Sequence, residues 1–213
     1  MALEATHLRF AKDMADILCI TNRADYYAGC VYPDSRYVTQ VPRRATHGAM
    51  SFLSETSDFE KGWSTHILYD RLVGTKYAEH SSFANQPIVG FNESWAYSTA
   101  AKIIEDQHSY AVLGQDVRLL QELTPPKVPP HQENQEPLEN YYQALHTLYR
   151  QRPSLDGYLQ LLQAFSIPID IARHVVTTAD ALGKDPKAVG DIEALYESSL
   201  QEGVAKIQLM INS

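Results

Sequence analysis

The pattern of apolar and polar positions is helical along almost the whole chain. Over residues 3–20 apolar side chains recur every three or four residues, and His7 lies on the same line. The same spacing predicts helices over residues 57–78, 92–111, 114–122, 138–151, 154–165, 168–182 and 188–211. Alternating runs of β-branched residues bounded by hairpin turns are missing from the sequence. We therefore expect an all-α fold, a multi-helix bundle with little or no sheet.

Glycine and proline interrupt this pattern in two places. Between residues 29 and 42 they predict a short helix, an irregular loop and a new helix near Ala45. Residues 124–137 contain five of the eleven prolines and few apolar side chains, as a linker or an exposed excursion does. We expect one all-α domain over residues 1–213, with three parts: 1–122, a proline-rich excursion over 123–137, and additional helices over 138–213.

Two ionisable residues interrupt the apolar face of the helix expected over residues 57–78. Helical spacing places His66 and Asp70 in line with four apolar or aromatic side chains, namely Phe59, Trp63, Val73 and Tyr77. Burying a histidine or a carboxylate without a partner costs several kcal/mol, roughly. The pair must therefore be hydrogen-bonded, ion-paired or bound to a metal ion.

Other candidate ligands lie on the first helical segments or in the loop between them. The full set is His7, Asp34, His47, His66 and Asp70. Imidazole and carboxylate groups are ligands for Zn, Mn and Fe. A single histidine on an apolar face is more often a hydrogen-bonded core residue than a ligand, as we expect for His174. The combination of five residues favours one metal site.

Composition and charge limit the possible partners. The 213 residues are 44% hydrophobic and 21% charged, which is typical of a soluble globular protein. The net charge of -8 argues against a broad nucleic-acid interface, because phosphate backbones are bound by clusters of Lys and Arg. Cys19 and Cys30 form no CxxC pair, and Cys19 is expected to be a small buried residue.

The sequence also bears on location. Charged residues interrupt the first fourteen residues, so they lack the apolar segment of a signal peptide. No run approaches the roughly 18 apolar residues that cross a bilayer. We expect a cytoplasmic protein with no membrane span.

Four short motifs carry a family resemblance. They are TH at Thr6–His7, GCVYPD at Gly29–Asp34, ATH at Ala45–His47 and GWSTHILYD at Gly62–Asp70. In this order they resemble the zinc-dependent phospholipase C family and the related single-strand-specific zinc nucleases. Those proteins are all-α metallohydrolases of phosphate esters. The resemblance covers about the first third of the chain.

The resemblance implies a ligand set. Asp34, His47, His66 and Asp70 would hold one metal ion, and Asp70 would bridge to a second ion that His7 also binds. The implied cofactor is Zn, or alternatively Mn, Fe or Ni, as one or two ions. A further ion in that family uses a histidine and an HxxxE helix. Here only His80, Glu105 and His108 could replace those ligands.

Arginines near the expected site suggest the substrate. Arg36 follows Asp34 by two residues, and a guanidinium there could bind phosphoryl oxygens. For Arg43 and Arg44 a purely surface role is slightly favoured. We expect a phosphoesterase that acts on a small phosphate ester through a metal-activated water, with Asp70 and Arg36 as catalytic residues.

Two alternatives stay open. The same residues could hold a structural metal ion or form a buried polar network in a protein without enzymatic activity. The discriminating feature is an open coordination position, since structural zinc sites are closed and catalytic sites keep one position open. A di-iron carboxylate protein is less favoured: the chain has two ExxH motifs, at Glu4–His7 and Glu105–His108, but no glutamate-bearing helix before the first.

Overall fold

The computed structural model describes residues 3–79 and 91–211, and every regular element in these residues is a helix. The first part contains α1 (Glu4–Ala15), α2 (Arg23–Val31), the 3₁₀ turn η1 (Tyr32–Ser35), α3 (Arg36–Thr39), α4 (Arg43–Thr46) and α5 (Asp58–Glu79). The second contains α7 (Phe91–Leu113), η2 (Gly114–Val117), α8 (Arg118–Glu122), α9 (Gln135–Tyr149), α10 (Leu155–Ala164), α11 (Ile169–Gly183) and α12 (Pro186–Ile211). The predicted all-α class is confirmed.

Two predictions about single residues are wrong. The first helix ends at Ala15 rather than near residue 20, and Cys19 is an exposed residue with a φ of 51° in the turn that follows. His174 lies on the exposed side of α11, whose buried face is formed by Ala172, Val175 and Ala179. Helical spacing alone did not locate the edge of that face.

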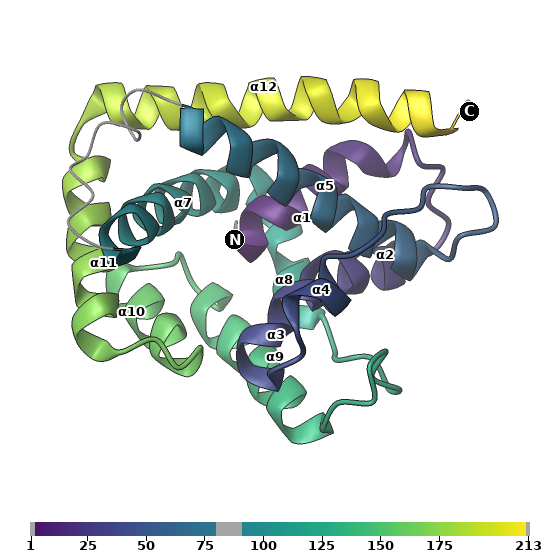
Figure 1. The fold of residues 1–213 in the computed structure, drawn as a ribbon, viewed down its shortest axis with the longest axis horizontal. Helices are drawn as coiled ribbons and strands as arrows, with labels where there is room; N and C mark the ends of the chain where they lie inside the picture. The colour runs from purple at the N-terminus through teal and green to yellow at the C-terminus, as the bar shows by residue number, and fades with distance from the viewer. Residues whose placement is uncertain (1–2, 80–90, 212–213) are drawn as a thin grey trace.

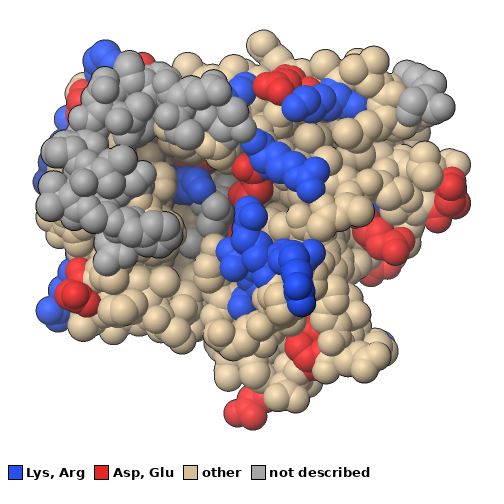
Figure 2. Space-filling view, viewed as in Figure 1, with Lys and Arg blue, Asp and Glu red and all other residues tan. Residues whose placement is uncertain are grey.

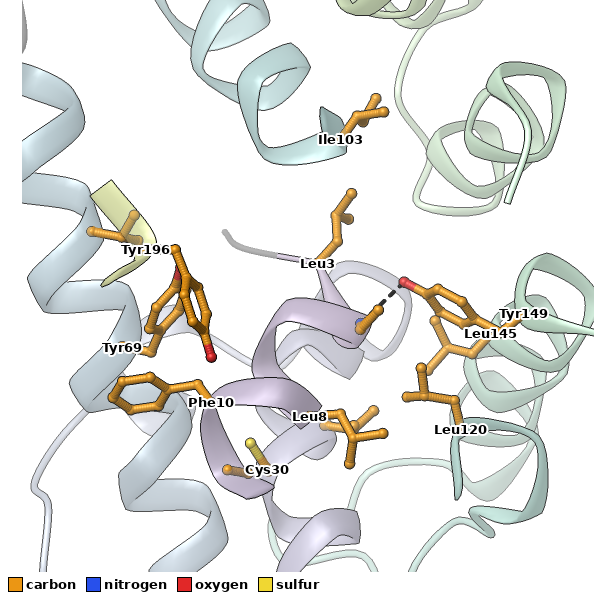
Figure 3. Packing of buried hydrophobic residues seen from close by; sticks show 14 of the residues in the cluster. Leu3, Leu8, Phe10, Cys30, Tyr69, Ile103, Leu120, Leu145, Tyr149 and Tyr196 are labelled. Atoms are coloured by element: carbon orange, nitrogen blue, oxygen red, sulfur yellow. Dashed lines mark hydrogen bonds between the residues drawn. The ribbon is translucent and has the colours of Figure 1, made fainter. Parts of the chain in front are cut away.

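The first helix lies in the middle of the fold. Figure 1 shows α1 surrounded by other helices, with α12 running along one side of the molecule across α5 and α7. The buried apolar side chains form one cluster that extends from Leu3 to Ile207. Close to α1, this cluster joins Leu8 and Phe10 to residues of α5, α8, α9 and α12 (Figure 3). Both halves of the chain therefore contribute to the surroundings of α1.

Two glycines bring α2 and α5 into backbone contact. A Cβ atom on Gly62 would lie 1.9 Å from the carbonyl oxygen of Tyr26, and one on Gly29 would lie 1.9 Å from the carbonyl oxygen of Phe59. Such distances exclude any side chain at either position unless the helices move apart. The close contact matters for the candidate site, because α2 and α5 both contribute to it.

The proline-rich segment runs over the surface and is attached to the site-bearing helices. The Tyr32 hydroxyl donates a hydrogen bond to Glu133, and the ring of His131 lies 5.4 Å from that of Trp63. Val128, within the same segment, is 80% exposed. Among the described residues, we find no helix with the length and apolarity that a bilayer crossing requires.

Candidate metal centre

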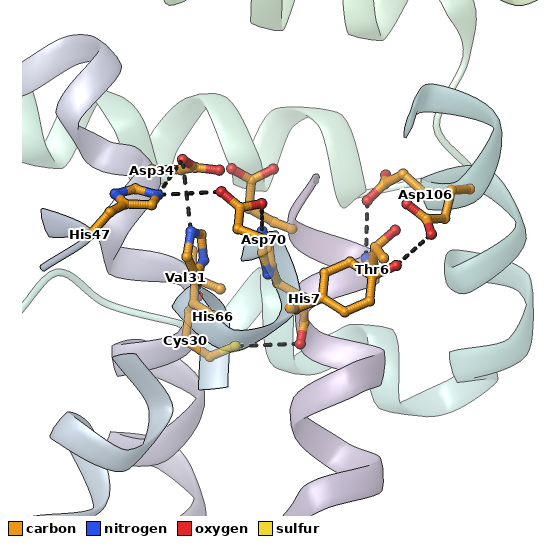
Figure 4. A network of polar contacts seen from close by, with 12 residues as sticks. Thr6, His7, Cys30, Val31, Asp34, His47, His66, Asp70 and Asp106 are labelled. Atoms are coloured by element: carbon orange, nitrogen blue, oxygen red, sulfur yellow. Dashed lines mark hydrogen bonds and ion pairs between the residues drawn. The ribbon is translucent and has the colours of Figure 1, made fainter. Parts of the chain in front are cut away.

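Five predicted ligands converge from four parts of the fold. His7 comes from α1, Asp34 from η1, His47 follows α4 directly, and His66 and Asp70 lie one turn apart on α5. Figure 4 shows these side chains pointing toward one another. All are almost fully buried, with side-chain exposures of 0% for His7, Asp34 and His66, 4% for His47 and 6% for Asp70.

The distances between ligand atoms suit a metal ion. Asp34 Oδ1 lies 4.0 Å from His47 Nε2 and 3.9 Å from His66 Nε2, and His47 Nε2 lies 3.4 Å from Asp70 Oδ2. A tetrahedral ion with bonds of about 2.0–2.2 Å holds its ligand atoms about 3.3–3.6 Å apart. Asp34, His47 and His66 offer ligand atoms that all lie within 4.8 Å of one another, so these atoms would have to move inward to hold one ion.

Neighbouring groups orient two of the imidazoles. His66 Nδ1 donates to the backbone oxygen of Cys30 at 2.8 Å, so its Nε2 carries the free lone pair. His47 Nδ1 lies 2.8 Å from the Thr46 hydroxyl, and its Nε2 also faces the carboxylates. The contact with Cys30 depends on the close approach of α2 and α5, which explains why Gly62 precedes His66 by one turn.

His7 occupies a distinct position beside Asp70. Its ring stacks on that of His66 with centroids 3.7 Å apart, and its Nε2 lies 3.8 Å from Asp70 Oδ1. The other Asp70 oxygen faces His47. Two groups of potential ligands result, one of Asp34, His47 and His66 and one of His7, His66 and Asp70. Asp70 is thus placed so that each of its oxygens faces a different histidine.

Several buried atoms in this cluster lack hydrogen-bond partners. They are both oxygens of Asp34, both ring nitrogens of His7, and the Nε2 atoms of His47 and His66. Each unsatisfied buried polar atom costs about 1–3 kcal/mol. Imidazole nitrogens and carboxylate oxygens form a donor set for zinc and related divalent ions. The five residues therefore fit a metal ion chemically.

Burial shifts the pKa values of these groups. Burial lowers the pKa of His66 to about 4 and that of His7 well below its usual value. Burial and the charge of Asp70 raise the pKa of Asp34 to about 6. Although burial opposes this, nearby positive charge, followed by the contact with His47, holds the pKa of Asp70 well below its usual value. At neutral pH the site therefore combines neutral imidazoles with ionised carboxylates, as metal binding requires.

We expect Asp34→Asn to stabilise the metal-free protein at pH 8 but hardly at pH 4. The pKa of Asp34 is raised from 3.8 to about 6 in the folded state, so the folded protein binds this proton more tightly than the unfolded chain does. Ionisation of Asp34 therefore lowers the free energy of unfolding progressively as pH rises from 4 to 6. The gain at pH 8 should be on the order of 1–3 kcal/mol. Urea unfolding in the presence of a chelator at both pH values measures it. An equal effect at the two pH values would contradict the raised pKa.

The structure separates the other predicted residues from this cluster. Glu105 is buried on α7, where it accepts a hydrogen bond from Tyr69, and burial raises its pKa to about 7. His108 points outward and lies 2.9 Å from Glu193. His80 lies outside the described residues. Neither Glu105 nor His108 belongs to a group of potential metal ligands in the described part of the chain.

Arginines gather on the surface near the cluster. Arg36 lies over the ring of Tyr37, 4.0 Å from its centroid, and its positive charge lowers the pKa of Asp34, although burial outweighs it. Arg43 and Arg44 are exposed on α4, which leads into His47. In the described residues none of the three is ion-paired with a carboxylate. Figure 2 shows basic side chains gathered over α3 and α4 beside a hollow in this face.

Glu4 lies next to the cluster. The sequence drew attention to this residue only through its ExxH spacing to His7. It is fully buried, and burial followed by the charges of Asp34 and Asp106 raises its pKa well above the usual value. The Tyr141 hydroxyl lies 2.8 Å from Glu4 Oε1 and 3.0 Å from the Val31 carbonyl oxygen. One hydroxyl proton cannot serve both acceptors, and a protonated Glu4 satisfies both.

The fold and the cluster together define an all-α protein with a buried site of three histidines and two aspartates that is suited to a divalent metal ion. None of the protein-family models matches this chain, and comparison with curated proteins and with solved structures likewise gives no match.

Proposed function

We propose that this protein is a metal-dependent hydrolase that acts on a phosphate ester. The observation that carries the proposal is the convergence of five buried ligand residues whose facing atoms mostly lack hydrogen-bond partners. The same residues form the ligand set implied by the resemblance to zinc-dependent phospholipases C and zinc nucleases. Zinc is the proposed ion, with Mn, Fe or Ni as alternatives.

The proposed roles follow from position and charge. His7, Asp34, His47, His66 and Asp70 would hold one or two ions, with Asp70 between them. A divalent ion in such a site lowers the pKa of a water molecule and neutralises charge on a phosphoryl group. Arg36 would bind phosphoryl oxygens and stabilise the negative charge that develops on them. Its place beside Asp34 and its lack of an ion-paired carboxylate among the described residues support this role.

A second candidate function is a structural metal site in a protein without enzymatic activity. Side-chain exposures of 6% or less are typical of closed structural sites. Within the described residues, the three arginines near the cluster have no carboxylate partner, and this favours the hydrolase because a structural ion needs no anion-binding groups around it. For the di-iron alternative, His108 would have to join the centre, but it pairs with Glu193 at the surface.

The proposed partner is a small soluble phosphate ester in the cytoplasm, rather than a long nucleic acid. The net charge of -8 supports this choice, because long nucleic acids are bound by extended clusters of Lys and Arg. Submicromolar, length-dependent binding of single-stranded DNA or RNA at physiological salt would move the proposal toward a nuclease.

We expect the protein to retain a transition metal when it is purified without added metal or chelator. After addition of Zn, Mn, Ni or Co it should hydrolyse at least one generic phosphomonoester or phosphodiester, such as a nitrophenyl phosphate. Elemental analysis and a chromogenic assay measure the two properties. Activity that survives exhaustive chelation would refute the mechanism. A fully loaded but inactive protein would favour the structural alternative.

We expect Arg36→Ala to lower kcat/KM for that ester by about 10- to 100-fold, because one preorganised charged donor is lost. Metal content should stay at the wild-type level, since Arg36 is not a ligand. Arg173→Ala, which removes an exposed arginine of α11, is the matched control and should leave both quantities unchanged. Equal kinetics for the two variants would exclude Arg36 from the reaction.

A further inference from the structure

Asp106 is a buried carboxylate on α7 that bonds to the first turn of α1. It is fully buried, and its Oδ1 accepts hydrogen bonds from the backbone N–H groups of Ala5 at 2.9 Å and Thr6 at 3.1 Å. The N-cap residue of α1, Leu3, has no side chain that can cap these groups. Asp106 therefore caps α1 from a position 100 residues away in sequence.

Two tyrosines fix the second oxygen of this carboxylate. Tyr149, the last residue of α9, donates to Asp106 Oδ2 at 2.9 Å, and Tyr158 of α10 donates to the same atom at 2.6 Å. Both hydroxyls come from helices that contribute no ligand to the candidate centre. Burial raises the pKa of Asp106 to about 6, while these hydrogen bonds favour its ionised form. The carboxylate is thus held in one place by four donors.

The capped turn carries His7. The backbone N–H of His7 bonds to Leu3, so His7 directly continues the turn that Asp106 holds. Among the described residues no hydrogen bond orients the His7 ring, in contrast to the rings of His66 and His47. In the described structure, its position relative to Asp70 is therefore fixed by packing and by the placement of α1 itself. Figure 4 shows Asp106 at one end of this turn and the metal ligands at the other.

We infer that Asp106, held by Tyr149 and Tyr158, is a positioning residue for the candidate metal centre that sets the place of His7 relative to Asp70. This inference rests on the proposed function, since it assumes that the centre binds metal. It also gives α9 and α10 a role in the site, although the five residues of the cluster all lie before residue 71.

The test measures metal binding by Asp106→Ala against His7→Ala. Both variants should show the same defect with Zn or Co: loss of one ion if the wild type binds two, or an affinity reduced by about tenfold or more if it binds one. Asp106→Asn should restore binding, because its amide oxygen can still accept from Ala5 and Thr6. Tyr158→Phe, which removes one of the four donors, should fall between the wild type and Asp106→Ala.

Leu162→Ala is the control for general destabilisation. Leu162 is buried on α10, and its apolar side chain cannot hydrogen-bond to a candidate ligand or to Asp106. This variant should therefore lower the unfolding temperature and keep wild-type metal binding. If Asp106→Ala does not fold, Tyr158→Phe decides by the same comparison. If a folded Asp106→Ala variant, or Tyr158→Phe in its place, binds metal with wild-type stoichiometry and affinity, the inference about Asp106 is overturned. The proposed function would not be affected by that result. A wild-type protein that binds no metal would overturn the proposed function as well.

Discussion

Asp70→Asn is expected to abolish most metal binding while leaving the fold intact. The asparagine keeps the shape of the side chain, but it loses the charge and one of the two oxygens that face His7 and His47. Loss of a direct ligand should weaken binding by about 100-fold or more, beyond the effect of changing a residue that only supports a ligand. At metal concentrations about 100 times the wild-type Kd, most of the about 2.7 kcal/mol of metal-conferred stability should disappear with it.

Mass spectrometry for metal content and thermal unfolding with and without added Zn measure these effects. Asp116→Asn is the matched control, because Asp116 is a half-exposed carboxylate that pairs with Lys12 and not with a histidine of the cluster. It should keep wild-type metal content. A core hydrogen bond between histidine and aspartate would instead make Asp70→Asn change stability equally with and without metal. Unchanged metal stoichiometry and affinity in both Asp70→Asn and His66→Ala would show that α5 binds no metal.

Gly62→Ala is expected to destabilise the protein by about 3 kcal/mol or more, because its methyl group would overlap backbone rather than a flexible side chain. The added Cβ would lie 1.9 Å from the Tyr26 oxygen and 2.9 Å from the Cys30 nitrogen. Separation of α2 from α5 would also break the 2.8 Å contact between His66 and Cys30. Metal affinity should therefore fall together with stability.

Gly74→Ala provides a control on the same helix. In the part of the chain that the structure describes, no atom outside the helix lies within 4 Å of a Cβ at Gly74, and the residue is exposed. The substitution should stabilise α5 by about 0.5–1 kcal/mol, the usual gain of alanine over glycine in a helix. Urea unfolding of the two variants should thus give changes of opposite sign. A Gly62→Ala variant as stable as Gly74→Ala would show that the two helices are not in backbone contact.

Local sequence determined the secondary structure of this protein and the identity of the candidate ligands. Three- and four-residue apolar spacing predicted most helices to within a few residues, because each helix buries one face and that requirement repeats along the chain. His66 and Asp70 stood out for the same reason, as ionisable residues on an otherwise apolar face. Gly62 was part of the GWSTHILYD motif, but the sequence did not show that it allows the backbone of α5 to contact that of α2.

Only the tertiary structure decided how the ligands are arranged and supported. Asp106 gave no signal in sequence, because its partners at Ala5 and Thr6 lie about a hundred residues away and use backbone groups that every residue has. His174 was misjudged because the edge of a buried face depends on which neighbouring helix covers it, and Cys19 was misjudged because the first helix ends at Ala15, before it reaches that residue. Helical spacing says which residues share a face, and packing between distant segments decides what that face meets.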